Sequence, residues 1–375
     1  MSKTSIEWTQ EVWNPTTGCN KINPGCKFCY AEVMHKRLMV MQPNKYSRPF
    51  LDGAFEHPES LLLPLKWKKP RTIFVNSMSD LFHDNISVDY IAQVYAIMFL
   101  ANQHTYQVLT KRSNRRREIL NSLEFMELLH KYINQFHDKY IKRLEQELYF
   151  FDDILNGFPF KNIWEGSSTA DQASLEAELP HLLETPAYVR FLSAEPLLGP
   201  LRLLQTYMLA VGKFPKGHVP KRREGLHWVI TGGESGNKAR PSHPDWYRSL
   251  KTECEAMKIP FFFKQWGKWL PIEQDSPNKI GPDFKREEEY TDRAEYEIEL
   301  NKFLKFWKKR IQVININGLI ITPHISMIEP HLADESLKPT AVYNYGKKNS
   351  GNLLDGEKHL NFPTLSHIST RDKYL

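Results

Sequence analysis

The sequence predicts an α/β protein whose core is a full or partial (β/α) barrel, and two observations indicate this. Short runs of β-branched and aromatic residues end in polar or glycine-containing turns at residues 72–76, 106–110, 162–166, 189–193, 227–231 and 260–264. Nearly continuous apolar strands of this kind are typical of a parallel sheet that is buried on both faces. The stretches between the runs read as helices, and a first strand fits around residues 12–14. An open, doubly wound sheet is the alternative.

The composition fits one large domain with decorations. The chain has 375 residues, of which 41% are hydrophobic, so apolar side chains suffice for a large core. Its formal net charge is only +6, which permits nucleic acid as a partner without requiring it. No apolar run approaches the roughly 18 residues of a membrane span, and the first residues lack the apolar core of a signal peptide. With four cysteines and no paired framework, we expect a cytoplasmic protein with no membrane contact.

Residues 1–270 hold the predicted barrel, which carries one insertion. A helix with a buried apolar stripe is expected to begin at Ser87. Residues from about 115 to 158 are more than one barrel connection needs, so they predict an inserted helix or helical hairpin. The predicted apolar face consists of Leu120, Leu123, Met126, Leu129, Ile133, Phe136, Tyr140, Leu144 and Leu148.

Two regions follow the predicted barrel. Residues 271–344 form an accessory region, in which residues 274–295 are rich in Pro, Asp, Glu and Lys and predict a linker. Residues 296–307 read as a helix, and residues 311–322 alternate between apolar and polar, so this region predicts a small α+β piece or a hairpin packed on the barrel. Residues 345–375 form a C-terminal tail with a loop rich in Gly and Lys.

Three of the four cysteines, Cys19, Cys26 and Cys29, lie in one short loop that also contains Pro and Gly. Three thiolates can hold three irons of a [4Fe–4S] cluster and leave the fourth iron open for a ligand, which suits catalysis. A zinc site would need a fourth ligand, which His35 could supply. The remaining interpretation is buried thiols, or a disulfide plus one thiol. The lone Cys254 lies in a helical run and is expected in the core.

Polar residues follow most of the predicted strands, and in a barrel the carboxyl ends of the strands share one ligand pocket. The candidates for binding a cofactor are Asn76, Ser77, Ser79, Asp80, Ser193, Gly232, Gly233 and Glu234. Three further residues are candidates for catalysis: Glu195 as an inward carboxylate, and Lys111 and Lys264 as contacts of an anionic ligand or partners of a carboxylate. Each of these residues can instead be an ordinary loop residue or a helix cap.

Two stretches are strongly basic, residues 110–117 and residues 213–223. The first lies at a strand end beside the expected pocket. Such stretches fit contacts to phosphate, which give affinity without reading bases. A solvated surface is the alternative interpretation.

The cysteine loop resembles that of the radical S-adenosylmethionine (SAM) enzymes, which commonly reads Cys-x3-Cys-x2-Cys with an aromatic residue before the third cysteine. Here Phe28 is that aromatic residue, and six residues instead of three separate Cys19 from Cys26. A closer resemblance is to a phage- and bacteria-borne family named after phage gene products 37 and 68, a radical-SAM-like group. The segments that carry this resemblance are residues 6–9, 13–19, 24–32, 76–83, 107–112, 193–199, 232–236, 239–241 and 262–267.

This resemblance implies a barrel of the radical-SAM type with a [4Fe–4S] cluster on Cys19, Cys26 and Cys29. Such a cluster cleaves SAM to a 5′-deoxyadenosyl radical, which then abstracts hydrogen from a substrate. Residues 76–80 would hold the amino end of SAM, and residues 232–234 its ribose, a carboxylate or the substrate. The implied partners are a flavodoxin-like or ferredoxin-like electron donor and a three-cysteine-motif partner protein, with nucleic acid as a possible substrate. The alternative is a zinc-stabilised nucleic-acid-binding protein without catalysis.

Overall fold

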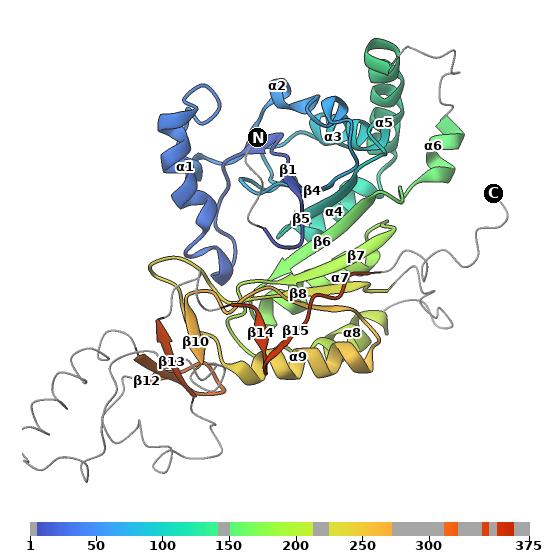
Figure 1. Cartoon of the computed structure of the whole chain (residues 1–375). Coiled ribbons are helices and arrows are strands. Elements are labelled where there is room, and N and C mark those ends of the chain that lie inside the picture. The colour runs from blue at the N-terminus through green and yellow to red at the C-terminus, as the bar shows by residue number, and fades with distance from the viewer. Residues whose placement is uncertain are drawn as a thin grey trace, which may run out of the picture.

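The computed structural model describes residues 6–141, 151–212, 225–271, 311–321, 340–344 and 351–363. Its centre is a parallel sheet of seven strands in the order β1-β4-β5-β6-β7-β8-β9 (Figure 1). The strands are β1 (Glu11–Val12), β4 (Thr72–Val75), β5 (Thr105–Thr110), β6 (Ile163–Thr169), β7 (Val189–Ala194), β8 (Trp228–Thr231) and β9 (Phe261–Phe263).

The sheet curls into a half-barrel flanked by helices, so the prediction of a partial (β/α) barrel is confirmed. All seven predicted strands are present, and every neighbouring pair is parallel. Spatial order follows chain order without the reversal that defines a doubly wound sheet, so that alternative is wrong.

Helices follow the strands and pack against the convex face of the sheet (Figure 1). They are α3 (Val88–Leu100), α4 (Ser113–Leu120), α7 (Gln172–Glu184), α8 (Leu203–Val211) and α9 (Pro244–Ala256). The helix predicted after Ser87 is confirmed, because the Ser87 hydroxyl accepts a hydrogen bond from the Tyr90 backbone N–H at 3.1 Å and caps α3. Within the described ranges, no helix is long and apolar enough to cross a lipid bilayer.

Aromatic side chains fill the concave face of the sheet. Trp8, from the segment before β1, has its ring centroid 4.8 Å from that of Phe74 and 6.4 Å from that of Trp228. Phe191 on β7 lies across β6 at Gly166, where an added Cβ would come within 2.2 Å of the Phe191 ring. The hollow of the half-barrel is therefore packed solid below its mouth.

The predicted insertion contains α5 (Leu123–Phe136), a π-helical turn η4 (His137–Ile141) and α6 (Phe151–Gly157). The prediction for its apolar face was partly wrong, because Leu123 is 65% exposed and Tyr140 is 43% exposed. The helix does not run on from Leu120: Ser122 starts a new helix by accepting a hydrogen bond from the Phe125 N–H, and this rotates Leu123 outward. Leu144 and Leu148 lie outside the described residues.

Short elements connect the N-terminal strands. They are β2 (Thr16–Thr17), η1 (Pro24–Cys26), α1 (Tyr30–Met41), η2 (Phe50–Asp52), β3 (Phe55–Glu56), α2 (Pro58–Leu61) and η3 (Pro64–Lys66). The strands β2 and β3 pair with each other and not with the main sheet.

The accessory region forms a second, antiparallel sheet in the order β10-β13-β11-β12. Its strands are β10 (Trp269–Pro271), β11 (Ile311–Ile314), β12 (Ile320–Ile321) and β13 (Thr340–Asn344). The predicted hairpin over residues 311–322 is therefore present as β11 and β12. The predicted linker at 274–295 and helix at 296–307 lie outside the described residues.

The tail returns to the barrel. After the hairpin of β14 (Leu353–Leu354) and β15 (Glu357–Lys358), residues 359–361 run antiparallel to β9. The Phe263 N–H donates to the His359 carbonyl at 2.7 Å, and the Trp228 indole donates to the Asn361 carbonyl at 2.7 Å. The tail thereby covers the open edge of the sheet at β9.

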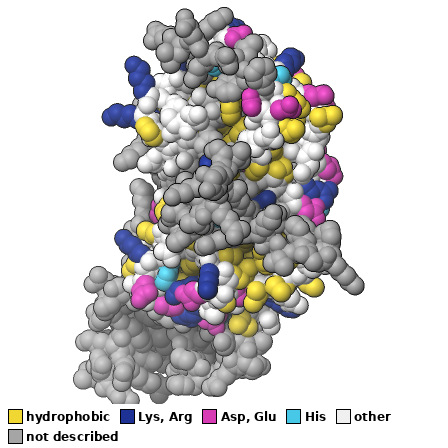
Figure 2. Space-filling view, turned by 90° about the vertical axis from the view of Figure 1, so that its right-hand side faces the viewer, with side chains coloured by type: hydrophobic (Ala, Val, Ile, Leu, Met, Phe, Trp, Pro, Cys, Tyr) yellow, Lys and Arg dark blue, Asp and Glu magenta, His cyan; other side chains and the backbone are white. Residues whose placement is uncertain are grey.

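The face shown in Figure 2 carries charged side chains of both signs. Lysine and arginine side chains adjoin aspartate and glutamate in parts of this face, whereas those at the upper left stand apart from acidic side chains. This agrees with the near balance of 50 basic and 44 acidic residues in the sequence.

Candidate cofactor site at the mouth of the barrel

The cysteine loop lies across the carboxyl ends of the parallel strands. At its start, Gly18 pairs with the loop after β4: its N–H donates to the Met78 carbonyl at 3.1 Å, and its carbonyl accepts from the Ser79 hydroxyl at 2.6 Å. Further along, a Cβ on Gly25 would lie 3.0 Å from Ala170, after β6, and 3.5 Å from Pro196, after β7. The loop therefore touches the mouth of the half-barrel on both sides.

Three of the predicted cofactor-binding residues fasten the N-terminal segment to the loop after β4. The Ser77 backbone N–H donates to Asn14 Oδ1 at 2.8 Å, and the Asn76 amide donates to the Thr16 hydroxyl at 2.6 Å. Ser79 binds Gly18, as described above. The carbonyl oxygen of the Asn76 side chain is buried without a hydrogen-bond partner among the described residues.

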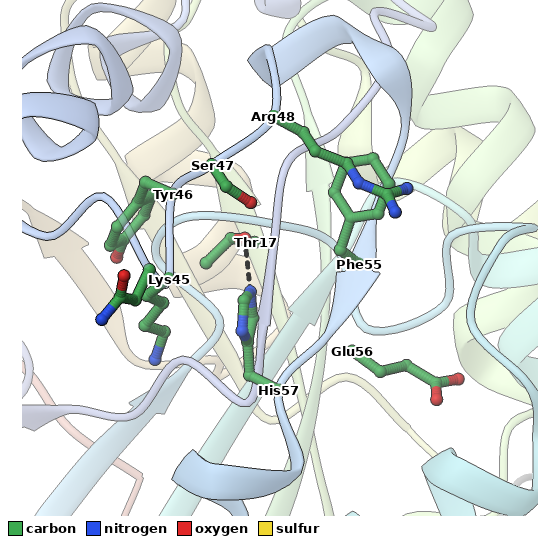
Figure 3. Close-up of a pocket in the computed structure, with 9 residues that line it drawn as sticks. Thr17, Lys45, Tyr46, Ser47, Arg48, Phe55, Glu56 and His57 are labelled. Atoms are coloured by element: carbon green, nitrogen blue, oxygen red, sulfur yellow. Dashed lines mark hydrogen bonds between the residues drawn. The ribbon is translucent and has the colours of Figure 1, made fainter.

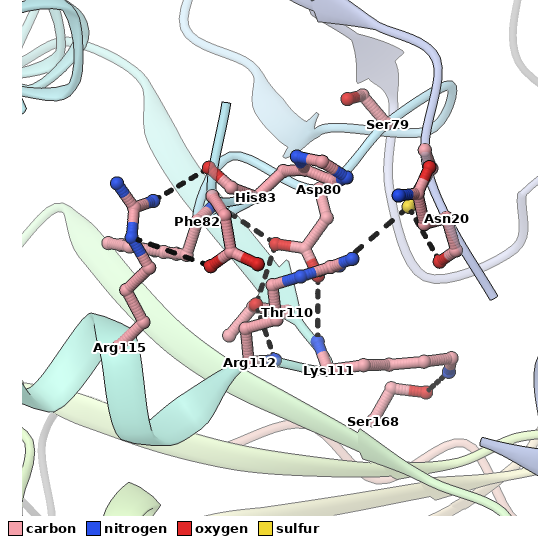
Figure 4. A network of polar contacts seen from close by, with 12 residues as sticks. Asn20, Ser79, Asp80, Phe82, His83, Thr110, Lys111, Arg112, Arg115 and Ser168 are labelled. Carbon is pink, nitrogen blue, oxygen red and sulfur yellow. Dashed lines mark hydrogen bonds and ion pairs between the residues drawn. The ribbon is translucent and has the colours of Figure 1, made fainter. Parts of the chain in front are cut away.

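Asp80 is the centre of a polar network that reaches the first cysteine (Figure 4). Its buried carboxylate accepts hydrogen bonds from the Thr110 hydroxyl at 2.6 Å and the Lys111 backbone N–H at 3.1 Å. It also pairs with the Arg112 guanidinium at 3.0 Å. Arg112 Nη1 in turn lies 3.7 Å from Cys19 Sγ. Asp80 thus positions a cation beside the Cys19 thiol and does not itself face a ligand.

The three thiols of the loop are free and close enough to interact. Burial raises the pKa of Cys19 to about 12, with Asp80 adding to the increase and Arg112 opposing it. Burial also raises the pKa of Cys29, and the charge of Cys26 acts on both of the other thiols. Burial therefore favours the neutral form of the Cys19 and Cys29 thiols, and a bound metal centre would supply the positive charge that thiolates require.

Three free thiols lie on one loop at the mouth of the half-barrel, and their number and chemical type are those of an iron–sulfur site with three cysteine ligands. No group of three or more His, Cys, Asp or Glu side chains in the described ranges is arranged to hold a single metal ion. His35 is buried, its Nε2 lies 2.8 Å from the Arg48 carbonyl oxygen, and its ring packs against Tyr46 and Phe50. These contacts favour a packing role for His35.

The predicted catalytic residues lie at the same mouth. Lys264 Nζ, after β9, is 2.5 Å from Glu195 Oε1, after β7. Lys111 contacts the Ser168 hydroxyl, and its charge acts on Cys29. The predicted ligand residue Ser193 is buried on β7. Lys111 makes no ion pair with any described residue, whereas Lys264 is neutralised by Glu195.

Tyr30 is a site residue that sequence reasoning missed. Its hydroxyl donates to the Ser77 carbonyl at 2.7 Å and joins the start of α1 to the loop after β4. Partial enclosure raises the pKa of Tyr30, and the negative charges of Cys29 and Glu195 raise it further. The signals available were its position directly after Cys29 and its place in the segment 24–32 of the family resemblance.

The glycines after β8 allow the loop after β8 to pack closely against the loop after β9. A Cβ on Gly233 would lie 1.9 Å from the Trp266 carbonyl oxygen, and one on Gly232 would lie 3.2 Å from the Gln265 carbonyl oxygen. The adjacent carboxylate of Glu234 is buried and pairs with Arg240 at 2.5 Å. Contacts within the protein therefore explain why Gly232, Gly233 and Glu234 occur at these positions, without a bound ligand.

Arg240 connects this region to the cysteine loop, which the sequence did not reveal. Its guanidinium donates to the Pro24 carbonyl at 3.0 Å and lies 5.2 Å from the centre of the Phe28 ring. Together with Glu234 it forms a clamp between the loop after β8 and the segment that carries Cys26. The only hint was the segment 239–241 in the family resemblance.

Replacing Arg240 with methionine is expected to destabilise the protein by about 1–3 kcal/mol, because the Glu234 carboxylate would stay buried without its cation. Urea unfolding measures this, and hydrogen exchange should show faster exchange in residues 24–28. The control is Arg202→Met, at an exposed arginine away from this clamp. Unchanged exchange in residues 24–28 of the Arg240 variant would contradict the clamp.

Most of the first basic stretch is engaged within the protein. Arg115 donates to the His83 and Ile86 carbonyls, both at 2.7 Å. Arg116 is fully buried, and Arg117 pairs with Glu184 at 2.7 Å. Arg115 and Arg116 are therefore bonded within the protein, whereas Arg117 lies at the solvated surface with Glu184 as its partner. The second basic stretch, residues 213–223, lies outside the described residues.

A cavity of about 270 Å³ adjoins the cysteine loop. It is lined by Ile22, Asn23, Pro24, Lys111, Asp171, Ala173, Ser174, Ala177 and Glu178. Lys111 thus has open space beside it on the side of the loop and the start of α7.

Fold and site together define a partial (β/α) barrel protein with a three-cysteine loop laid over its mouth. The chain belongs to a family of proteins of unknown function, DUF5131, whose model matches residues 3–363. No curated protein and no solved structure matches the chain.

Proposed function

We propose that the protein is a radical-SAM enzyme whose [4Fe–4S] cluster is held by Cys19, Cys26 and Cys29. The observation that carries the proposal is the position of three free thiols on one loop across the carboxyl ends of parallel strands, where barrels bind ligands and reactants. A cluster with three protein ligands would have an open iron, and it would supply the electron that cleaves SAM. The resemblance to the family of phage gene products 37 and 68 agrees with this proposal.

The residues around the loop would support such a centre in distinct ways. Arg112, fixed by Asp80, would offset the negative charge of the Cys19 thiolate. Lys111 is suited to an anionic group of SAM or of the substrate, because no described carboxylate pairs with it. The Glu195–Lys264 pair lies on the opposite wall and would hold or move a proton beside the substrate.

The proposal includes partners. A flavodoxin-like or ferredoxin-like protein in a reducing cytoplasm would donate the electron, and a three-cysteine-motif protein or a nucleic acid would be the substrate or partner. The zinc-stabilised nucleic-acid-binding alternative gains no support from the described residues, because His35 is packed and Arg115, Arg116 and Arg117 are bonded internally.

Electron paramagnetic resonance of the reduced, anaerobically reconstituted protein tests the proposal. We expect about four irons and four sulfides per chain and a [4Fe–4S]⁺ signal that changes on addition of SAM. Cys26→Ala should lose the signal, whereas Cys254→Ala, which removes a core cysteine on α9, should keep it. Chromatography should detect 5′-deoxyadenosine with the wild type and not with Cys26→Ala.

Two outcomes would contradict the proposal. Stoichiometric zinc and no iron after reconstitution would leave the zinc alternative. A cluster that forms equally well in Cys26→Ala would show that this loop is not its ligand set.

A further inference from the structure

A second cavity, of about 320 Å³, lies beside β2 and β3 (Figure 3). It is lined by three segments of chain: Thr17 on β2, residues 44–48 after α1, and residues 55–57 at β3. Its volume is in the range of pockets that bind small molecules. Nothing described above for the cysteine loop uses this cavity.

The cavity has a surplus of positive charge. Lys45 and Arg48 both line it, and neither makes an ion pair with any described residue. The one carboxylate in the lining, Glu56, accepts hydrogen bonds from the Ser87 N–H at 2.9 Å and the Ser87 hydroxyl at 2.8 Å. Figure 3 shows the Glu56 side chain directed away from Lys45 and Thr17. By contrast, Arg112 and Arg240 are matched by carboxylates.

Both cations keep donor capacity. The Lys45 ammonium has three protons, and two are used on the Asn14 carbonyl at 2.8 Å and the Ser60 hydroxyl at 2.7 Å. The Arg48 guanidinium is held 4.6 Å over the Phe55 ring, a contact that orients it but leaves its N–H edge unused. Burial lowers the pKa of Lys45, and a bound anion would offset this cost.

Neutral polar groups complete the lining. The Thr17 hydroxyl and His57 Nε2 are 2.7 Å apart, and the exposed Ser47 lies between Lys45 and Arg48 in the chain. An aromatic wall is provided by Tyr46 and Phe55. Two cations and two hydroxyl groups in one lining match the charge and the several acceptor oxygens of a phosphate.

We propose that this cavity binds a phosphate-bearing ligand, with Arg48 and Lys45 as its charged contacts. The proposal does not rest on the proposed cluster, because none of the lining residues is a cysteine. The phosphate could belong to a free nucleotide or to the backbone of a nucleic acid. These sources share one chemistry and are separated by the test.

The test is isothermal titration of the full-length protein with inorganic phosphate, AMP and a short single-stranded oligonucleotide. We expect saturable binding of at least one probe, and binding at least tenfold weaker for Arg48→Met. Arg48→Lys should retain part of the affinity. The matched control is Arg37→Met, at an exposed arginine of α1 outside the cavity, which should bind like the wild type.

Ser47→Asp provides a second variant that does not depend on Arg48. It adds a carboxylate at an exposed lining position and should repel phosphate while leaving the fold intact. Preference for AMP would identify a free nucleotide, and preference for the oligonucleotide would identify a nucleic-acid backbone. Absence of binding for all three probes, or equal affinity in Arg48→Met and Ser47→Asp, would overturn the proposal.

Discussion

Replacing Gly233 with alanine is expected to destabilise the protein by more than about 3 kcal/mol. The added Cβ would lie 1.9 Å from the oxygen and 2.5 Å from the carbon of the Trp266 carbonyl. Neither loop can easily retreat, because Gly233 N donates to the Gln265 carbonyl at 2.8 Å and Lys268 N donates to the Glu234 carbonyl at 2.9 Å. Urea unfolding followed by circular dichroism measures the effect.

A glycine in open space is the matched control. A Cβ on Gly199 would have no other heavy atom within 4 Å, so Gly199→Ala should change the free energy of unfolding by less than about 0.5 kcal/mol. Equal unfolding midpoints for the two variants would mean that the loops after β8 and β9 are not in contact.

Replacing Arg116 with methionine is expected to cost about 3–5 kcal/mol of folding stability, because it leaves Glu165 charged and buried without its cation. Arg116 also donates to the Gly166 carbonyl at 2.6 Å and the Ser167 hydroxyl at 2.9 Å. The control is its neighbour Arg117→Met, whose ion pair with Glu184 is solvent-accessible and should contribute less than about 1 kcal/mol.

The loss in the Arg116 variant should depend on pH. Burial raises the pKa of Glu165, and Arg116 opposes that increase. A carboxyl whose folded-state pKa is raised binds its proton more tightly when folded, so its stabilisation is present at low pH and lost as pH rises through that pKa. Removing Arg116 raises this pKa further. The destabilisation should therefore be smaller at about pH 5 than at about pH 8, and a loss that is independent of pH would contradict this account.

The central sheet was predictable because its strands are buried on both faces. Runs such as residues 72–76 and 189–193 must then be apolar almost without a break, and this is visible without partners. The start of α3 at Ser87 was also predictable, because a helix cap depends only on residues within one turn of the helix. The prediction failed at Leu123. It assumed one continuous helix with a single apolar face, whereas one helix ends before Ser122 and a new helix begins after it.

The roles of charged residues were far less predictable. Arg116 and Arg117 are adjacent and chemically identical, yet one is buried against β6 and the other pairs at the surface with Glu184. Their partners are distant in sequence, so no local pattern distinguishes them. The pairing of Glu234 with Arg240 was equally hard to predict. The glycine-rich sequence at residues 232–236 is typical of a ligand-binding loop, whereas its residues contact other parts of the protein.

The return of the tail to β9 has a consequence for the order of events during synthesis. The residues that cover β9 are synthesised about 100 residues after it. At a translation rate of 5–20 residues per second, the edge of β9 therefore stays uncovered for about 5–20 s. During that interval, the indole of Trp228 lacks its acceptor at Asn361, and its ring lacks the cover of Phe362. During synthesis, the edge of β9 is therefore exposed for a time and can pair with a strand of another chain.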